Sequence, residues 1–358
     1  MKISQTKKNL TIETLRGLAI ILMVLGHVIG SGSDNGLKVA DDSIWRFSYY
    51  AFQYIRMPLF TVISGFVYAY KPVSRFTSNS KFITGKINRL LIPLVVVATL
   101  FYLLQYFTPG TNSKNDLGDI WHIYVLPYAH FWFLQGMMCV FLIITVLENF
   151  KVLDTLKSAM VCLVIAALIF ILLPFKSFYF SLNRVPFLLT FFILGLSLKR
   201  FYDVIFKKGI IRIAAVIFVV SLSYQLYLFD VDAGERIANF LTFCVGSSAC
   251  ILMISLGYQN SKLVWLGDFS YAIYLFHIFG AVTARVLLAK LSVHNIPLQI
   301  LIGLTAGVSF PVLLRLLCGS NKILSVAFFG DKISSKKPPV PIKSTGSVPN
   351  SHSRIFPY

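Results

Sequence analysis

The sequence predicts an all-α membrane protein, a polytopic bundle of about ten transmembrane helices with both termini in the cytoplasm. Three observations lead to this fold class. Hydrophobic residues make up 56% of the 358 positions. Only 13% of the positions are charged, which is about half the charged share of an ordinary soluble domain. Long apolar segments recur along the chain, and the basic residues concentrate in alternate gaps between them.

The apolar segments predict the transmembrane helices in order. Most of them approach the length of about 20 residues that a helix needs to cross a bilayer. The sixth is shorter than the others, and no gap between segments is long enough to hold a soluble domain. The segments lie at residues 11–30, 54–70, 90–108, 131–147, 158–174, 186–198, 210–229, 237–256, 268–289 and 297–318.

The basic residues predict the orientation and the domain boundaries. Most of the 33 lysines and arginines lie before the first segment, in alternate gaps and after the last segment. Loops rich in Lys and Arg stay in the cytoplasm, so both termini are expected there. The sequence therefore predicts a cytoplasmic N-terminus at 1–10, a membrane domain at 11–318, and a basic, disordered cytoplasmic tail at 319–358.

The composition also argues against two other kinds of site. The net charge of +19 follows from the loop pattern, and no basic face with interleaved aromatic residues predicts nucleic-acid binding. The five cysteines lie in or at the ends of apolar segments, and none has C-x-x-C spacing. We therefore expect buried thiols, with neither a metal site nor a disulfide framework.

The first apolar segment contains three ionisable residues, Glu13, Arg16 and His27. Such residues are unfavourable inside a bilayer and often mark functional sites. Eleven positions separate Arg16 from His27, close to three helical turns, so all three side chains share one stripe. This pattern predicts a catalytic site with His27 deeper than Arg16. The alternative is that Arg16, paired with Glu13, reaches lipid phosphate while His27 only hydrogen-bonds another helix.

Polar residues in later segments extend the candidate site. A Ser64–Gly65 pair interrupts the second segment, where it indicates either a substrate contact or close helix packing. Four basic residues follow in the next cytoplasmic gap, and they suit a phosphate-rich ligand or simply reflect the positive-inside rule. They are Arg75, Lys81, Lys86 and Arg89.

Two further patterns contain histidines. Ser270, Tyr274 and His277 form a polar stripe at i, i+4 and i+7 in the ninth segment. His130 and Trp132 open the fourth segment, and an interfacial aromatic belt explains that pair without any function.

Several of these motifs together resemble the acyltransferase 3 family, integral membrane O-acyltransferases of cell-surface carbohydrates. The resemblance covers residues 10–318, and its most specific element is Arg16-x10-His27. Glu13 replaces the aspartate usual in the family. The esterase-like extracytoplasmic domain of some members has no counterpart here, so the protein acts unaided or a partner completes the transfer. The other matching elements are MPLFTVISGF (57–66), Lys86-x-x-Arg89-Leu90, FWFL (131–134) and FSYAIYLFH (269–277).

The resemblance implies an acyl-CoA donor, most often acetyl-CoA, and no permanently bound cofactor. Arg16, Arg75, Lys86 and Arg89 would then bind the phosphates of CoA. His27, with Glu13 and Arg16, would be catalytic, either as general base or as acyl carrier. Residues that would bind substrate are Ser64, Tyr274 and His277.

The implied acceptor is a surface polysaccharide or a lipid-linked glycan at a bacterial inner membrane. Other expected partners are membrane lipids and proteins of glycan assembly. A transporter or flippase of a lipid-linked sugar is the alternative, although the inverted repeats that favour it are not evident. A structural membrane subunit is the third reading.

Overall fold

The computed structural model describes residues 9–109 and 116–332. Within these ranges all regular structure is helical, and ten long helices correspond to the ten predicted segments. They are α1 (Leu10–Ile29), α2 (Ile44–Tyr68), α3 (Asn79–Phe107), α5 (Trp132–Asn149), α6 (Leu156–Leu172), α7 (Val185–Arg200), α9 (Lys208–Tyr227), α10 (Gly234–Ser255), α11 (Ser261–Lys290) and α12 (Ile296–Cys318). Short helical pieces connect them: η1 (Val73–Arg75), η2 (Leu117–Asp119), α4 (His122–Val125), η3 (Tyr179–Arg184), α8 (Tyr202–Ile205) and α13 (Lys322–Phe329).

The chain is a multi-pass membrane protein, and the expected fold class is confirmed. Eight of the described helices are long and apolar enough to cross a membrane. Of the remaining two long helices, α6 is apolar but has only 17 residues. The 25-residue helix α2 carries Arg46 and Arg56 within its length, which lowers its hydropathy. The ten long helices therefore follow the ten predicted segments in order, and eight of them meet the length and hydropathy of a membrane span.

Three helices begin well before the apolar segments that predicted them, because polar side chains cap their N-termini. Ser43 Oγ accepts a hydrogen bond from the backbone N–H of Arg46 at 3.2 Å, so α2 starts at Ile44. Ser78 caps α3 in the same way, and Asn260 caps α11. Caps satisfy N–H groups that the first helical turn leaves unpaired. These helices therefore extend from the apolar layer into the polar surface.

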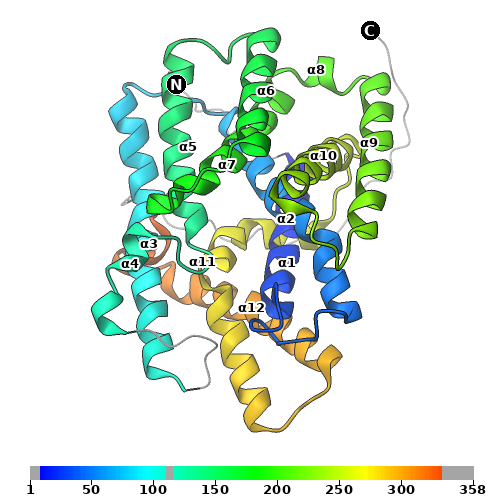
Figure 1. Ribbon diagram of the computed structural model, residues 1–358. Helices are drawn as coiled ribbons and strands as arrows, with labels where there is room; N and C mark the ends of the chain where they lie inside the picture. The colour runs from blue at the N-terminus through cyan, green and yellow to red at the C-terminus, as the bar shows by residue number, and fades with distance from the viewer. Residues whose placement is uncertain (1–8, 110–115, 333–358) are drawn as a thin grey trace, which may run out of the picture.

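Helix α1 lies near the centre of the bundle, with α2, α11 and α12 against it, whereas α9 lies at one edge (Figure 1). In their most apolar windows, 67% of α1 is buried but only 17% of α9. The ionisable residues of α1 are therefore surrounded by other helices rather than by lipid.

Glycines allow two helix pairs to approach closely. A Cβ at Gly17 of α1 would lie 2.1 Å from the carbonyl oxygen of Leu263 in α11. Between α2 and α7 the contact is reciprocal, since a Cβ at Gly65 would meet Phe192 O at 2.0 Å and one at Gly195 would meet Val62 O at 1.9 Å. Small residues at such contacts let helix backbones pack in a membrane. The Ser64–Gly65 pair therefore includes a packing glycine.

Replacing a packing glycine should destabilise the bundle. In Gly195→Ala the added methyl group must displace the backbone of α2, and we expect a loss of about 1–3 kcal/mol from overpacking. The matched control is Gly85→Ala in α3, where nothing lies within 4 Å of the added Cβ. Thermal unfolding of the detergent-solubilised proteins measures both. Equal melting temperatures for the two variants would contradict the close α2–α7 contact.

Candidate functional site

Three histidines from distant parts of the chain form a cluster inside the bundle. His27 lies near the end of α1, His130 just before α5, and His277 in the middle of α11. The ring centroid of His277 lies 5.0 Å from that of His27 and 4.7 Å from that of His130, and the other two are 6.2 Å apart. His130 and His277 are buried, at 3% and 0% exposure, whereas His27 has an exposed side chain. The cluster therefore presents one accessible imidazole supported by two buried ones.

Backbone carbonyls fix the orientation of the two buried rings. Nδ1 of His277 lies 3.0 Å from Ile273 O and 2.9 Å from Tyr274 O. Nε2 of His130 lies 3.3 Å from Leu275 O. A carbonyl oxygen only accepts, so these ring nitrogens donate. The opposite nitrogens, His277 Nε2 and His130 Nδ1, are buried without a hydrogen-bond partner among the described residues. Buried unpaired nitrogens of this kind are unusual and point to a site that handles protons or substrate.

The exposed surface of His27 faces a cavity of about 320 Å³, which we call the outer cavity. His27 and His130 line it where it reaches the cluster. The basic residues of the loops predict that α1 runs from the cytoplasm outward, and in that orientation this cavity lies in the outer half of the bundle. Its other polar lining side chains are Ser31, Asn35, Tyr49, Arg56, Gln105, Arg285 and Gln299.

A second cavity, which we call the inner cavity, has a volume of about 440 Å³. It lies near the start of α1, the end of α2 and the start of α3, which are the ends predicted to face the cytoplasm. Four cations line it, and no aspartate or glutamate is among its described lining residues. Aromatic rings, including Phe60 and Phe133, line the cavity as well, together with Ser64 and Tyr274. A cationic cavity with an apolar wall suits a ligand that carries phosphates at one end and a less polar arm at the other. The four cations are Arg16, Lys71, Lys86 and Arg89.

Tyr274 connects the two cavities. Its ring lines the inner cavity, and its hydroxyl donates to the backbone carbonyl of His130 at 2.6 Å. His130 in turn lines the outer cavity. The histidine cluster therefore lies where the two cavities approach each other.

The predicted stripe on α1 is divided between these cavities. Arg16 lines the inner cavity and donates to Glu13 Oε2 at 2.7 Å. Glu13 is only 8% exposed, and its carboxylate pairs with the guanidinium of Arg16. This ion pair orients the Arg16 side chain. Fourteen positions separate Glu13 from His27, a distance of roughly 21 Å along the helix axis. The structure therefore places Arg16, with its partner Glu13, at the inner end of the stripe and His27 at the outer cavity.

The basic residues after α2 separate into two groups. Lys86 lines the inner cavity, with its ammonium 3.9 Å from the ring centroid of Phe141. Arg75, in η1, is exposed and does not line the cavity, whereas Lys71 does. The structure brings Arg16, Lys86 and Arg89 together and leaves Arg75 outside the group.

Arg89 already has an anionic neighbour. Its Nη1 donates to Phe329 O at 2.7 Å and to Asp331 Oδ1 at 2.9 Å, and its guanidinium lies 4.0 Å from the ring centroid of Tyr271. The other Asp331 oxygen accepts hydrogen bonds from Arg315 and Ser325. Asp331 therefore holds a carboxylate beside a cavity-lining arginine.

This contact changes the expected limit of the C-terminal tail. The segment from residue 319 is not disordered throughout, since Lys322–Phe329 form α13 and Phe329 is buried. Apolar residues at 323, 324, 326, 328 and 329 give this short piece a face that packs, among other contacts, against α3. The remaining predicted tail, residues 333–358, lies outside the described residues.

The predicted substrate residues occupy different places. Ser64 and Tyr274 line the inner cavity, with Ser64 Oγ donating to Phe60 O at 2.9 Å. His277 lines neither cavity and packs between His27 and His130. The interpretation of His130 as an interfacial belt residue is wrong, because its ring is buried in the cluster. No sequence spacing relates His130 to His27, so only the fold reveals their contact.

The fold and the cluster define a membrane protein with three clustered histidines between an inner and an outer cavity. The chain matches the Acyl_transf_3 family, described as an acyltransferase domain, over residues 9–316. It therefore belongs to the acyltransferase 3 family, and it is a membrane acyltransferase. Comparison with curated proteins gives no match, and comparison with solved structures gives none either.

The Asp331 contact should stabilise the fold in a pH-dependent way. Burial raises the pKa of Asp331, but hydrogen bonds from Ser325 and Arg315 and the charges of Arg315 and Arg89 outweigh burial and hold that pKa below its ordinary value. An ionised Asp331 therefore stabilises the protein above its unfolded pKa of about 3.9. This contribution disappears as the pH falls through the lower, folded pKa.

We expect Asp331→Asn to lower the free energy of unfolding by about 1–2 kcal/mol near pH 7, because each lost contact was charge-assisted but partly exposed. The difference from wild type should vanish at the acid limit. The control is Asp42→Asn, an exposed aspartate in the loop between α1 and α2. Thermal unfolding across this pH range tests the contact, and a pH-independent difference would contradict it.

Proposed function

We propose that this protein is an O-acyltransferase of a bacterial inner membrane. It takes an acyl group, expected to be acetyl, from acyl-CoA at the cytoplasmic side. It transfers that group to a hydroxyl of a surface polysaccharide or a lipid-linked glycan at the other side. The observation that carries the proposal is the histidine cluster between a cationic inner cavity and a polar outer cavity.

The inner cavity supports acyl-CoA as the donor. Guanidinium and ammonium groups form strong charge-assisted hydrogen bonds with phosphate, and Arg16, Lys86 and Arg89 bring three such groups to the lining of one cavity. The pantetheine arm would then lie along the aromatic wall, past Phe60 and Phe133, toward Tyr274. In this arrangement a phosphate replaces Asp331 as the anionic neighbour of Arg89.

The outer cavity supports an acceptor that arrives from the opposite side. A hydroxyl in this cavity reaches His27, whose side chain is exposed there. In the direct route, the imidazole takes the hydroxyl proton as the oxygen attacks the thioester carbonyl. The C–S bond then breaks, and the CoA thiolate leaves and takes a proton from the imidazolium.

The acyl-carrier route divides the same reaction into two steps. An imidazole nitrogen of His27 attacks the thioester, and CoA leaves as its thiol. The acyl group then passes from the imidazole to the acceptor hydroxyl, and the hydroxyl proton returns to the ring. Both routes need the same neutral imidazole, so the position of His27 supports them equally.

His27→Ala should abolish acyl transfer without unfolding the protein. A positioned acid–base group accounts for about 10²–10⁴-fold in rate, and an acyl carrier for at least as much. The measurement is transfer from labelled acetyl-CoA in membranes, together with a mass comparison of surface glycans from cells with and without the gene. His294→Ala, an exposed histidine before α12, is the control. A stable His27→Ala variant with wild-type activity would contradict the role of His27.

Lys86→Ala should weaken donor binding more than turnover. It removes one charge-assisted phosphate contact, so we expect the KM for acetyl-CoA to rise roughly tenfold or more with a smaller effect on kcat. The control is Lys81→Ala, an exposed lysine five residues earlier in the same helix that does not line the cavity. If both variants leave the KM unchanged, the basic residues here serve membrane orientation alone.

A further inference from the structure

Arg56 lines the outer cavity, and its positive charge has no carboxylate partner among the described residues. Its guanidinium lies 4.3 Å from the ring centroid of Tyr49 and donates to the hydroxyl of that tyrosine. It also crosses α1 at Gly26, where an added Cβ would lie 1.6 Å from Arg56 Nη1. Gly26 directly precedes His27. The fold therefore holds a cation beside the backbone of the proposed catalytic residue.

A second arginine, Arg285 of α11, lines the same cavity and donates to the carbonyl of Gly36 at 3.2 Å. The described residues that line this cavity include no aspartate or glutamate. Cations inside a membrane bundle are unfavourable unless an anion, a carbonyl or water compensates them. The lining of the outer cavity thus has excess positive charge.

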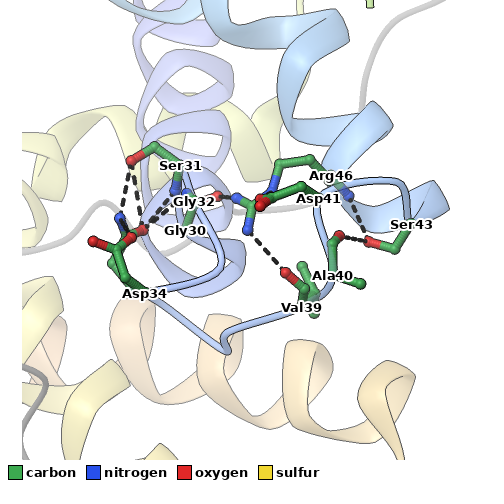
Figure 2. A network of polar contacts seen from close by, with 10 residues as sticks. Gly30, Ser31, Gly32, Asp34, Val39, Ala40, Asp41, Ser43 and Arg46 are labelled. Atoms are coloured by element: carbon green, nitrogen blue, oxygen red, sulfur yellow. Dashed lines mark hydrogen bonds and ion pairs between the residues drawn. The ribbon is translucent and has the colours of Figure 1, made fainter. Parts of the chain in front are cut away.

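Arg46 lies on the same helix as Arg56 but has a structural role, and the partners of the two arginines can be compared. Figure 2 shows its guanidinium reaching into the loop between α1 and α2. There it pairs with Asp41 at 3.2 Å and donates to the carbonyls of Gly30 and Val39. Arg56 has no carboxylate partner of this kind among the described residues. The two arginines therefore differ in their partners: Arg46 binds the loop, whereas Arg56 lines the cavity.

The Arg46 contacts also hold the loop that forms one wall of the outer cavity. The loop that they hold contributes Ser31, Asn35 and Gly36 to the lining. Asn35 Oδ1 accepts a hydrogen bond from the backbone N–H of Ser31 at 2.6 Å, so the loop is fastened at both ends. A cavity of about 320 Å³ is at the small end for ligand pockets and suits the terminal unit of a larger molecule.

We propose that the acceptor is anionic, and that Arg56 and Arg285 bind its carboxylate or phosphate group while one of its hydroxyls lies at His27. This inference rests on the proposed function, because an acceptor presupposes acyl transfer. Planar guanidinium groups bind carboxylate and phosphate in pairs of parallel hydrogen bonds. The substrate class is therefore a glycan that carries an acidic sugar or a phosphate near the acylated hydroxyl.

The test compares three matched probes on the full chain in lipid nanodiscs. Methyl glucoside is neutral, methyl glucuronoside carries a carboxylate, and glucose 1-phosphate carries a phosphate. Two readouts are used: the rise in melting temperature with probe, and the formation of acylated probe from acetyl-CoA. We expect at least one anionic probe to act at about tenfold lower concentration than the neutral one. Whichever anionic probe acts at the lower concentration distinguishes carboxylate from phosphate.

The variants connect this preference to the two arginines. Arg56→Gln and Arg285→Gln should each lose the preference for the anionic probe, while the KM for acetyl-CoA stays unchanged. Arg56→Lys keeps the charge and should retain part of the preference. Arg236→Gln removes an exposed arginine at the start of α10 that does not line the outer cavity, and it should behave like wild type.

Several outcomes would overturn the inference. Equal action of neutral and anionic probes on wild type, including no action by any probe, would do so. An equal loss with all probes in Arg56→Gln, together with slower acetyl-CoA turnover, would assign Arg56 to the thioester instead. The proposed function fails separately, if wild type never turns over acetyl-CoA although an anionic probe still raises its melting temperature through Arg56.

Discussion

The close packing of α1 against α11 is the contact on which the arrangement of the site depends. Gly17 admits the backbone of Leu263, and Gly267 admits that of Glu13, where an added Cβ would lie 2.5 Å from the Glu13 carbonyl oxygen. In a bilayer, helices associate through such close contacts rather than through burial from water. The packing brings His27 of α1 against His277 of α11, and the same α1 carries Arg16 into the inner cavity. One helix pair therefore sets the distance between the two ends of the site.

The cations of the bundle differ in their partners. Several are paired with a carboxylate, as Arg200 is with Glu148 at 2.6 Å, and as Arg16 and Arg89 of the inner cavity are with Glu13 and Asp331. Lys86 and Arg56, one in each cavity, lie on aromatic rings instead and have no carboxylate partner among the described residues. A ring face holds a cation in place while its N–H groups stay available for a ligand. This shared device supports an anion-binding role at both ends of the site.

The sequence was sufficient for the fold class and for part of the site. Hydropathy located the long helices because an apolar span of fixed length is required by the bilayer itself. The stripe of Arg16 and His27 followed from the helical period, which relates residues of one helix. The helix starts at Ile44 and Asn79 were harder to predict from the sequence, because capping residues rather than hydropathy determine them.

The rest of the site depends on contacts between helices, which no spacing encodes. His130 joins His27 only through the packing of the start of α5, and its neighbours FWFL resemble an ordinary interfacial belt. Asp331 reaches Arg89 across 242 positions, through a helix that hydropathy alone did not separate from the tail. Arg56 lay among the few basic residues of the predicted outer side, and only its place at the cavity and its partners distinguish it from Arg46.

Under the proposed function, both cavities bind the negatively charged part of a substrate with cationic side chains. CoA carries its negative charge on phosphates that remain at the inner cavity, and the proposed acceptor carries its own at the outer cavity. Only the uncharged acyl group then passes the histidine cluster, so transfer moves no net charge across the bilayer. The buried rings of His130 and His277 and the hydroxyl of Tyr274 fill the space between the cavities, with 2.6 Å between that hydroxyl and the His130 carbonyl. Holding each anion on its own side keeps both charged groups out of the apolar centre, where they would be most unfavourable.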